Sequence, residues 1–158
     1  MPSVVTESSD TLRPVEVPEI PHVVQVVLDT TDPRASAEFW RQFLGLRYRP
    51  GHEPPAPGED DLAGRDWLNL LTTSGDPCLA FQRVEELPRS TWPSSTIPQQ
   101  MHLDLSVPSF ERLMSAKSRA LELGGEVRFD RSDSLEEPLL VFTDIDGHPF
   151  CVLVRDYD

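Results

Sequence analysis

The sequence predicts an α+β fold made of two βαβββ modules, whose curved mixed sheets surround a central cavity. Two observations lead to this fold class. The same order of a strand, a capped helix, a glycine and three further strands occurs twice along the chain. In addition, Gln25 and His102 each stand seven residues before the N-cap of their helix, so they occupy equivalent places on the opening strands of the two halves.

The first half opens with a strand and an amphipathic helix. Residues 22–28 are β-branched and largely apolar, which predicts a mostly buried strand. Asp32 then provides an N-cap, Pro33 suits the first helical position, and large apolar side chains recur at helical spacing as far as Leu44. Gly45 is expected to end this helix in the left-handed conformation. Three strands are expected to follow, at residues 46–49, 66–72 and 78–84.

The second half repeats this order after a proline-rich linker at residues 86–98. A strand at residues 101–107 precedes a helix from Phe110 to Leu123, which Ser109 caps and two glycines end. The last three strands are expected at residues 126–129, 138–143 and 150–155.

The chain is predicted to form a single domain preceded by an arm. Its 158 residues can bury one substantial core but are too few for two domains of typical size. Within the domain, at residues 21–158, the first module covers about residues 21–85 and the second about residues 99–156. Residues 1–20 are rich in Pro, Glu, Ser and Thr without periodicity, which predicts a flexible N-terminal arm.

The composition excludes several classes of partner. A formal net charge of −13 argues against binding to nucleic acid and to anionic membrane surfaces, and it favours solubility or long-range attraction of cationic ligands. No apolar stretch approaches the ~18 residues that span a bilayer. Cys78 and Cys151 are too few for a disulfide framework, and the N-terminal residues do not resemble a signal peptide. We therefore expect a cytoplasmic protein.

Three motifs, in order, resemble a known superfamily. VVLDTTDPRASAEFWRQFLGLRY resembles the opening strand and helix of the glyoxalase/bleomycin-resistance/extradiol dioxygenase proteins, also called the vicinal oxygen chelate superfamily. HLDLSV resembles the first strand of their second module, and DIDGHPFCVLV resembles their closing strand. The resemblance covers about residues 20–156 and implies a glyoxalase-like domain.

This resemblance implies a metal site to which each module contributes two ligands. The matching positions fall on Gln25 and His102, which would bind one divalent ion such as Zn, Ni, Mn or Fe. The other two positions, usually glutamates, fall on Ala80 and Cys151. Because no carboxylate is left to act as a general base, ordinary glyoxalase I activity is not expected.

Further residues are candidates for ligand binding. Trp67 and Asn69 share one face of a strand, and Asp104 shares a face with His102 and could orient its imidazole ring. For each candidate the alternative is a structural role in the core, in a turn or as an inert buried thiol. The full set of ligand-binding candidates is Trp67, Asn69, Gln82, Asp104, His148 and Cys151.

Two functions remain open from the sequence. The first is a protein that holds a small organic molecule between its modules, as bleomycin-resistance proteins do. The second is a divalent-metal-dependent lyase, isomerase or dioxygenase that acts on a small oxygenated substrate. Whether the chain is an enzyme is left undecided, and the resemblance implies a homodimer.

Overall fold

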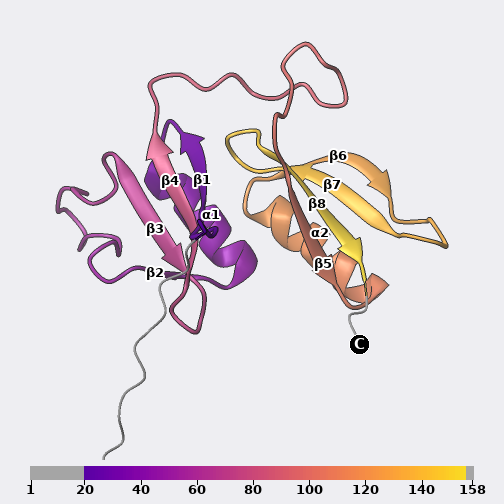
Figure 1. The fold of residues 1–158 in the computed structure, drawn as a ribbon, viewed down its shortest axis with the longest axis horizontal. Helices are drawn as coiled ribbons and strands as arrows, with labels where there is room; N and C mark the ends of the chain where they lie inside the picture. Colours follow the sequence, from indigo (N-terminus) through magenta and orange to yellow (C-terminus); the bar gives the residue numbers. More distant parts are fainter. Residues whose placement is uncertain (1–19, 156–158) are drawn as a thin grey trace, which may run out of the picture.

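The computed structural model describes residues 20–155, in which two modules lie side by side (Figure 1). In chain order the first module comprises β1 (Val26–Thr30), α1 (Pro33–Leu44), β2 (Arg47–Tyr48), β3 (Trp67–Leu71) and β4 (Pro77–Arg83). The second comprises β5 (Leu103–Val107), α2 (Phe110–Glu122), β6 (Glu126–Arg131), β7 (Leu139–Thr143) and β8 (Pro149–Val154). The predicted α+β fold of two βαβββ modules is confirmed. The predicted arm lies outside the described residues, except for its last residue.

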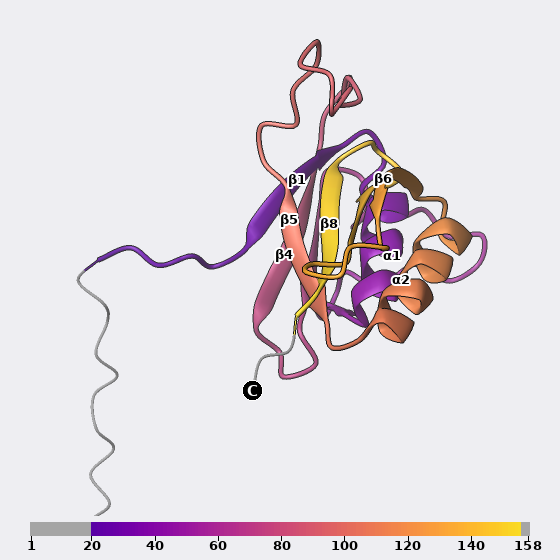
Figure 2. The same cartoon turned by 90° about the vertical axis from the view of Figure 1, so that its right-hand side faces the viewer.

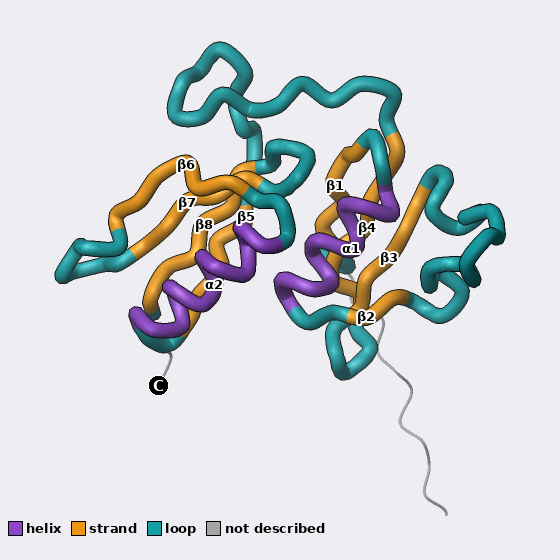
Figure 3. Tube along the Cα trace, turned by 180° about the vertical axis from the view of Figure 1, so that it is seen from behind, coloured by secondary structure: helices purple, strands orange, loops and turns teal. Residues whose placement is uncertain are grey.

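The two sheets have the same topology. Their strand orders are β1-β4-β3-β2 and β5-β8-β7-β6, and in each sheet the opening strand pairs in parallel with the closing strand. The other pairs are antiparallel. Both helices lie on the same side of the strands, as Figures 2 and 3 show. The opposite face of each sheet is therefore available for a binding site.

Two opening strands begin later than predicted. β1 starts at Val26 rather than at His22, and β5 starts at Leu103 rather than at Met101. In the first sheet, the parallel ladder with β4 runs only from Val26 opposite Leu79 onward. The ladder thus begins two residues after Pro77, the first residue of β4. Gln25 and His102 thus lie immediately before their strands.

The helix ends agree with the sequence analysis. Asp32 caps α1 by accepting a hydrogen bond from the backbone N–H of Ala35 at 3.0 Å, and Gly45 ends that helix with a φ of 68°. Ser109 caps α2 in the same way, with the backbone N–H of Arg112 as donor at 3.2 Å. Local capping thus fixes where both helices begin.

The core between the modules is aromatic. Phe150, on β8 of the second module, is fully buried against three side chains of α1. Its ring centroid lies 4.9 Å from that of Trp40, 5.3 Å from that of Phe43 and 6.2 Å from that of Phe39. Phe142 on β7 stacks against Phe150 from within the second module, at 5.2 Å. Packing of α1 on β8 therefore holds the two modules together.

Hydrogen bonds add to this contact. The indole N–H of Trp40 donates to the carboxylate of Asp144 at 3.0 Å, although the two residues are 104 positions apart. The Nε of Arg119 on α2 donates to the backbone carbonyl of Gln42 on α1 at 2.8 Å. Each bond crosses from one module to the other.

Neither helix in the described part of the chain is long and apolar enough to cross a membrane.

The contact between Phe150 and the aromatic side chains of α1 should contribute strongly to the stability of the whole domain. Phe150→Ala should lower the free energy of unfolding by about 3–5 kcal/mol, because it opens a cavity between the modules. Leu135→Ala is the matched control: Leu135 is fully exposed, so its loss should change stability by no more than about 0.5 kcal/mol. Chemical denaturation of both variants measures the difference. Equal unfolding midpoints would contradict the role given to Phe150.

Candidate functional site

A cluster of amide and ring groups lies on the helix-free face of the first sheet. The Nδ2 of Asn69 donates to the Oε1 of Gln25 at 2.9 Å, and the indole N–H of Trp67 donates to the Oδ1 of Asn69 at 2.7 Å. The backbone N–H of Asn69 donates to the Nδ1 of His52 at 3.0 Å. The side-chain oxygen of Gln25, the expected metal ligand, is thus already engaged by a neighbour.

His52 is a member of this cluster that sequence analysis missed. Burial, together with the charges of Arg49 and Arg34, lowers the pKa of His52. Its ring therefore favours the neutral form, which can accept the hydrogen bond from Asn69. His52 lies in a long loop between β2 and β3, where the sequence has no periodicity that would point to it.

The candidates on β4 provide no ligand for a metal. Ala80, at the position of an expected glutamate, is fully buried and has no donor atom. Gln82 is exposed and lies between Asp29 and Trp67 in the register of the sheet. Gln82 lines neither of the two hollows described next.

A small hollow of about 230 Å³ lies on the helix-free face of the second sheet, where it contains three of the predicted residues. The Nε2 of His102 is 3.4 Å from the Oδ1 of Asp104, and Cys151 lies opposite Asp104 in the register of β5 and β8. Burial and the charges of Asp104 and Glu137 raise the pKa of Cys151 to about 11. Cys151 is therefore a neutral thiol at physiological pH, which makes it a weak metal ligand.

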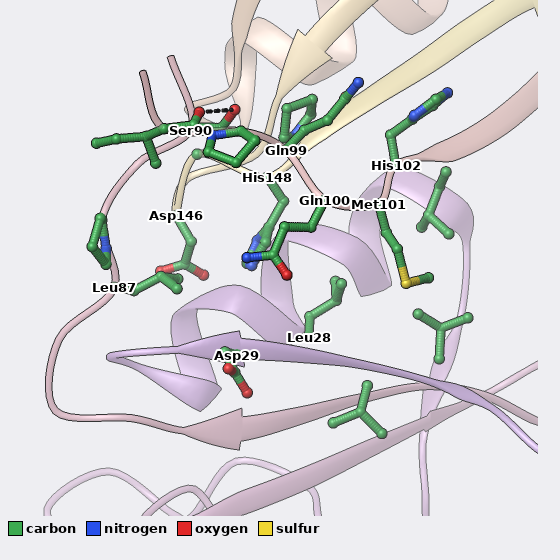
Figure 4. Close-up of a pocket in the computed structure, with 18 of the residues that line it drawn as sticks. Leu28, Asp29, Leu87, Ser90, Gln99, Gln100, Met101, His102, Asp146 and His148 are labelled. Carbon is green, nitrogen blue, oxygen red and sulfur yellow. Dashed lines mark hydrogen bonds between the residues drawn. The ribbon is translucent and has the colours of Figure 1, made fainter. Parts of the chain in front are cut away.

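A larger cavity of about 400 Å³ lies between the modules. β1 contributes one wall, and the linker and the residues just before β5 contribute another. The turn between β7 and β8 closes the cavity from the second module (Figure 4). We call it the inter-module cavity. Its principal lining side chains are Val27, Leu28, Asp29, Leu87, Ser90, Gln99, Gln100, Met101, His102, Leu103, Asp146 and His148.

The β7–β8 turn is organised by Asp144, which is fully buried. Its Oδ1 accepts hydrogen bonds from the backbone N–H groups of Asp146 and His148, at 3.0 and 2.9 Å. Its Oδ2 accepts from the indole of Trp40, and it lies 2.8 Å from the Nδ1 of His148. Because a carboxylate can only accept, we assign the hydrogen of this last bond to Nδ1.

The side chains of Asp146 and His148, both in this turn, reach the inter-module cavity. Burial lowers the pKa of His148, but the hydrogen bond and charge of Asp144 outweigh it, so the net shift is upward. The Oδ2 of Asp146 is buried without a hydrogen-bond partner. The ligand atoms of Asp144, Asp146 and His148 lie within 4.8 Å of one another, so these residues form a group that could hold a divalent ion.

The structure thus divides the predicted site residues among a hydrogen-bonded cluster, the small hollow and the inter-module cavity, which His148 lines. Gln82 belongs to none of these places. Gln25, Trp67 and Asn69 form one hydrogen-bonded cluster, while His102, Asp104 and Cys151 share the small hollow. His102 also lines the inter-module cavity, whereas Gln25 lines neither hollow.

Sequence analysis missed two acidic residues of the inter-module cavity, Asp29 and Asp146. For Asp146 a signal was present: the sequence DIDGH places two acids and a histidine at alternate positions of a turn. For Asp29 no local pattern marked a role.

Comparisons with known proteins identify the family. A family model of the glyoxalase-like domain matches residues 25–153. No curated protein matches the sequence significantly. One similar solved structure is the fosfomycin resistance protein FosX from Listeria monocytogenes, with a TM-score of 0.60, 15% identity and coverage of 88% of this chain and 94% of that one.

Two further solved structures have the same fold. A glyoxalase/bleomycin resistance protein/dioxygenase family enzyme from Burkholderia phytofirmans has a TM-score of 0.57 and 14% identity, with coverage of 83% and 96%. A hypothetical protein from S. aureus has a TM-score of 0.56 and 19% identity, with coverage of 85% and 97%. The family match spans most of the chain and agrees with the paired modules, so this protein belongs to the glyoxalase-like domain family, within the vicinal oxygen chelate superfamily.

Proposed function

We propose that this protein binds a small organic molecule in the inter-module cavity. The observation that carries the proposal is the cavity itself. Its volume of about 400 Å³ is in the range of ligand sites, and both modules and the linker contribute to its walls. Apolar side chains of β1, of the linker and of the residues at the start of β5 line the cavity, and a few polar groups converge on the same space.

The residues at the four metal-ligand positions of the superfamily support binding over metal-dependent catalysis. Gln25 is hydrogen-bonded to Asn69, and Ala80 has no donor atom. Cys151 is held as a neutral thiol, which leaves His102 as the one strong ligand of the four. None of the four positions carries a carboxylate that could itself bind a dication and balance its charge.

A divalent-metal-dependent lyase, isomerase or dioxygenase is the second candidate. The observation that favours it is the group formed by Asp144, Asp146 and His148. Superfamily members use divalent metals, and carboxylate and imidazole are ligands that suit Mn, Fe or Zn. The difficulty lies in Asp144, whose two oxygens already make four hydrogen-bonding contacts.

Filling the inter-module cavity should remove binding. We expect the chain to bind the neutral, polarity-sensitive dye Nile red with a saturable rise in fluorescence. Val27→Trp should weaken this binding by at least about fivefold, because the indole occupies space that the ligand needs. Leu135→Trp, which adds the same ring at an exposed site away from the cavity, should leave the affinity unchanged. Equal affinities in the two variants would reject the inter-module cavity as the binding site.

Metal analysis separates the two candidate functions. If the chain is purified without chelator, the binding proposal expects far less than one divalent ion per chain. The second candidate expects bound metal that Asp146→Asn removes, whereas a site at the superfamily's positions would lose its metal in His102→Ala. His22→Ala, which removes an exposed histidine outside both hollows, is the control. Stoichiometric metal that only Asp146→Asn depletes would favour the enzyme.

A further inference from the structure

The two acidic side chains of the inter-module cavity lie toward one end, which we call its acidic end. In Figure 4 Asp29 and Asp146 lie on the same side as Leu87. Met101 and His102 lie on the opposite side, and Leu28 lies between. The lining contains no lysine or arginine. Its remaining polar side chains are neutral or titratable: Ser90, Gln99, Gln100, His102 and His148.

The carboxylate of Asp146 lacks a hydrogen-bond donor at one of its oxygens. Its Oδ2 is buried and accepts no hydrogen bond. Burial raises the pKa of Asp146, the nearby hydroxyls of Ser36 and Thr30 oppose this shift, and the charge of Asp144 adds to it. The Oγ of Ser36, on α1, is also buried without a partner. Asp146 also lines the cavity, so a ligand that brings a donor to its carboxylate from the cavity side would be favourable here.

The cations near the acidic end are already paired with other groups. Arg89 passes over the turn at Gly147, where it donates to the carbonyl of Ile145 at 2.7 Å and pairs with Glu126 at 3.6 Å. His148 is paired with Asp144 at 2.8 Å, and the charges of Asp146 and Asp29 add to the upward shift of its pKa. Among residues 20–155, no ion pair joins Asp29 or Asp146 to a lysine or an arginine.

We propose that the inter-module cavity selects a protonated amine carried on an apolar body, with Asp29 and Asp146 binding the ammonium group. The inference rests on the proposed function, because it names the class of ligand for the same cavity. Asp29 comes from the first module and Asp146 from the second, so the ammonium group lies where both modules contribute charge. Leu28, Met101 and Leu103 then contact the apolar body.

The side chains that line the cavity favour a primary or secondary ammonium group over anions, quaternary ammonium ions and divalent metal ions. An anionic ligand would meet two carboxylates and no lysine or arginine. A quaternary ammonium ion has no N–H, so it could donate no hydrogen bond to either carboxylate. A divalent ion would compete with the hydrogen bonds that hold Asp144. A primary or secondary ammonium group supplies both the charge and the donors.

A matched pair of small ligands tests the selection. 2-(1-Naphthyl)ethylamine is protonated at pH 7, and 2-(1-naphthyl)ethanol has the same ring and chain length without the charge. Titration calorimetry of the full chain should show the amine binding at least about tenfold more tightly than the alcohol, since hydrogen bonds to charged groups are the stronger ones. Both ligands should displace Nile red.

Substitution of the two carboxylates should abolish the preference. Asp29→Asn and Asp146→Asn should each reduce the ratio of amine to alcohol affinity, and the double variant should bring it to about one, because the charges that the ammonium group binds are gone. Asp133→Asn is the matched control: it makes the same change in net charge at an exposed residue outside the cavity and should keep the preference. Thermal unfolding of each variant verifies that the fold is kept.

Three results would overturn the inference. Equal binding of amine and alcohol to the unmodified chain would reject selection for a cation while leaving the cavity as a binding site. An amine preference that survives in the double variant would place the ammonium group elsewhere. Displacement of the amine by one equivalent of Zn²⁺ would assign the carboxylates to a metal. Failure of the proposed function is distinct, because Nile red binding would then be insensitive to Val27→Trp.

Discussion

The hydrogen bond from Trp40 to Asp144 is the contact on which both the packing of the modules and the shape of the candidate site depend. A fully buried carboxylate is tolerated only when donors surround it, and Asp144 has donors from two directions. The indole comes from α1 of the first module, while the backbone N–H groups of Asp146 and His148 come from its own turn. Asp144 therefore joins the aromatic packing around Phe150 in holding the modules together, and it also orients the turn that carries Asp146 and His148 into the cavity.

The two modules share a topology but present different chemistry. Gln25 and His102 lie at equivalent places, just before the first strand of each sheet. Gln25 is held by Asn69 in a network of neutral groups, whereas His102 stays half-exposed beside Asp104 and borders both hollows. Equivalent positions in the two modules therefore have different neighbours, so Gln25 and His102 can have different roles although they lie at the same place in the repeated fold.

The fold could be predicted from the sequence because its signals are local. The caps at Asp32 and Ser109 and the turn at Gly45 each fix the end of an element within a few residues. The repeated order of elements then gives the topology. Strand ends were less accurate: β1 begins at Val26, where its parallel ladder with β4 begins, and that pairing is not visible in residues 22–25.

The candidate site was predicted only in part because its geometry is set by contacts between distant residues. His102, Asp104 and Cys151 could be grouped from strand periodicity and from the resemblance to the family. Asp29 and Asp146 could not, since they line one cavity only after Trp40 and Phe150 have packed α1 against the second module. Their separation is therefore a property of the interface between the modules. Packing between the modules positions both carboxylates before any ligand arrives, and such preorganisation lowers the cost of binding a ligand whose charge matches them.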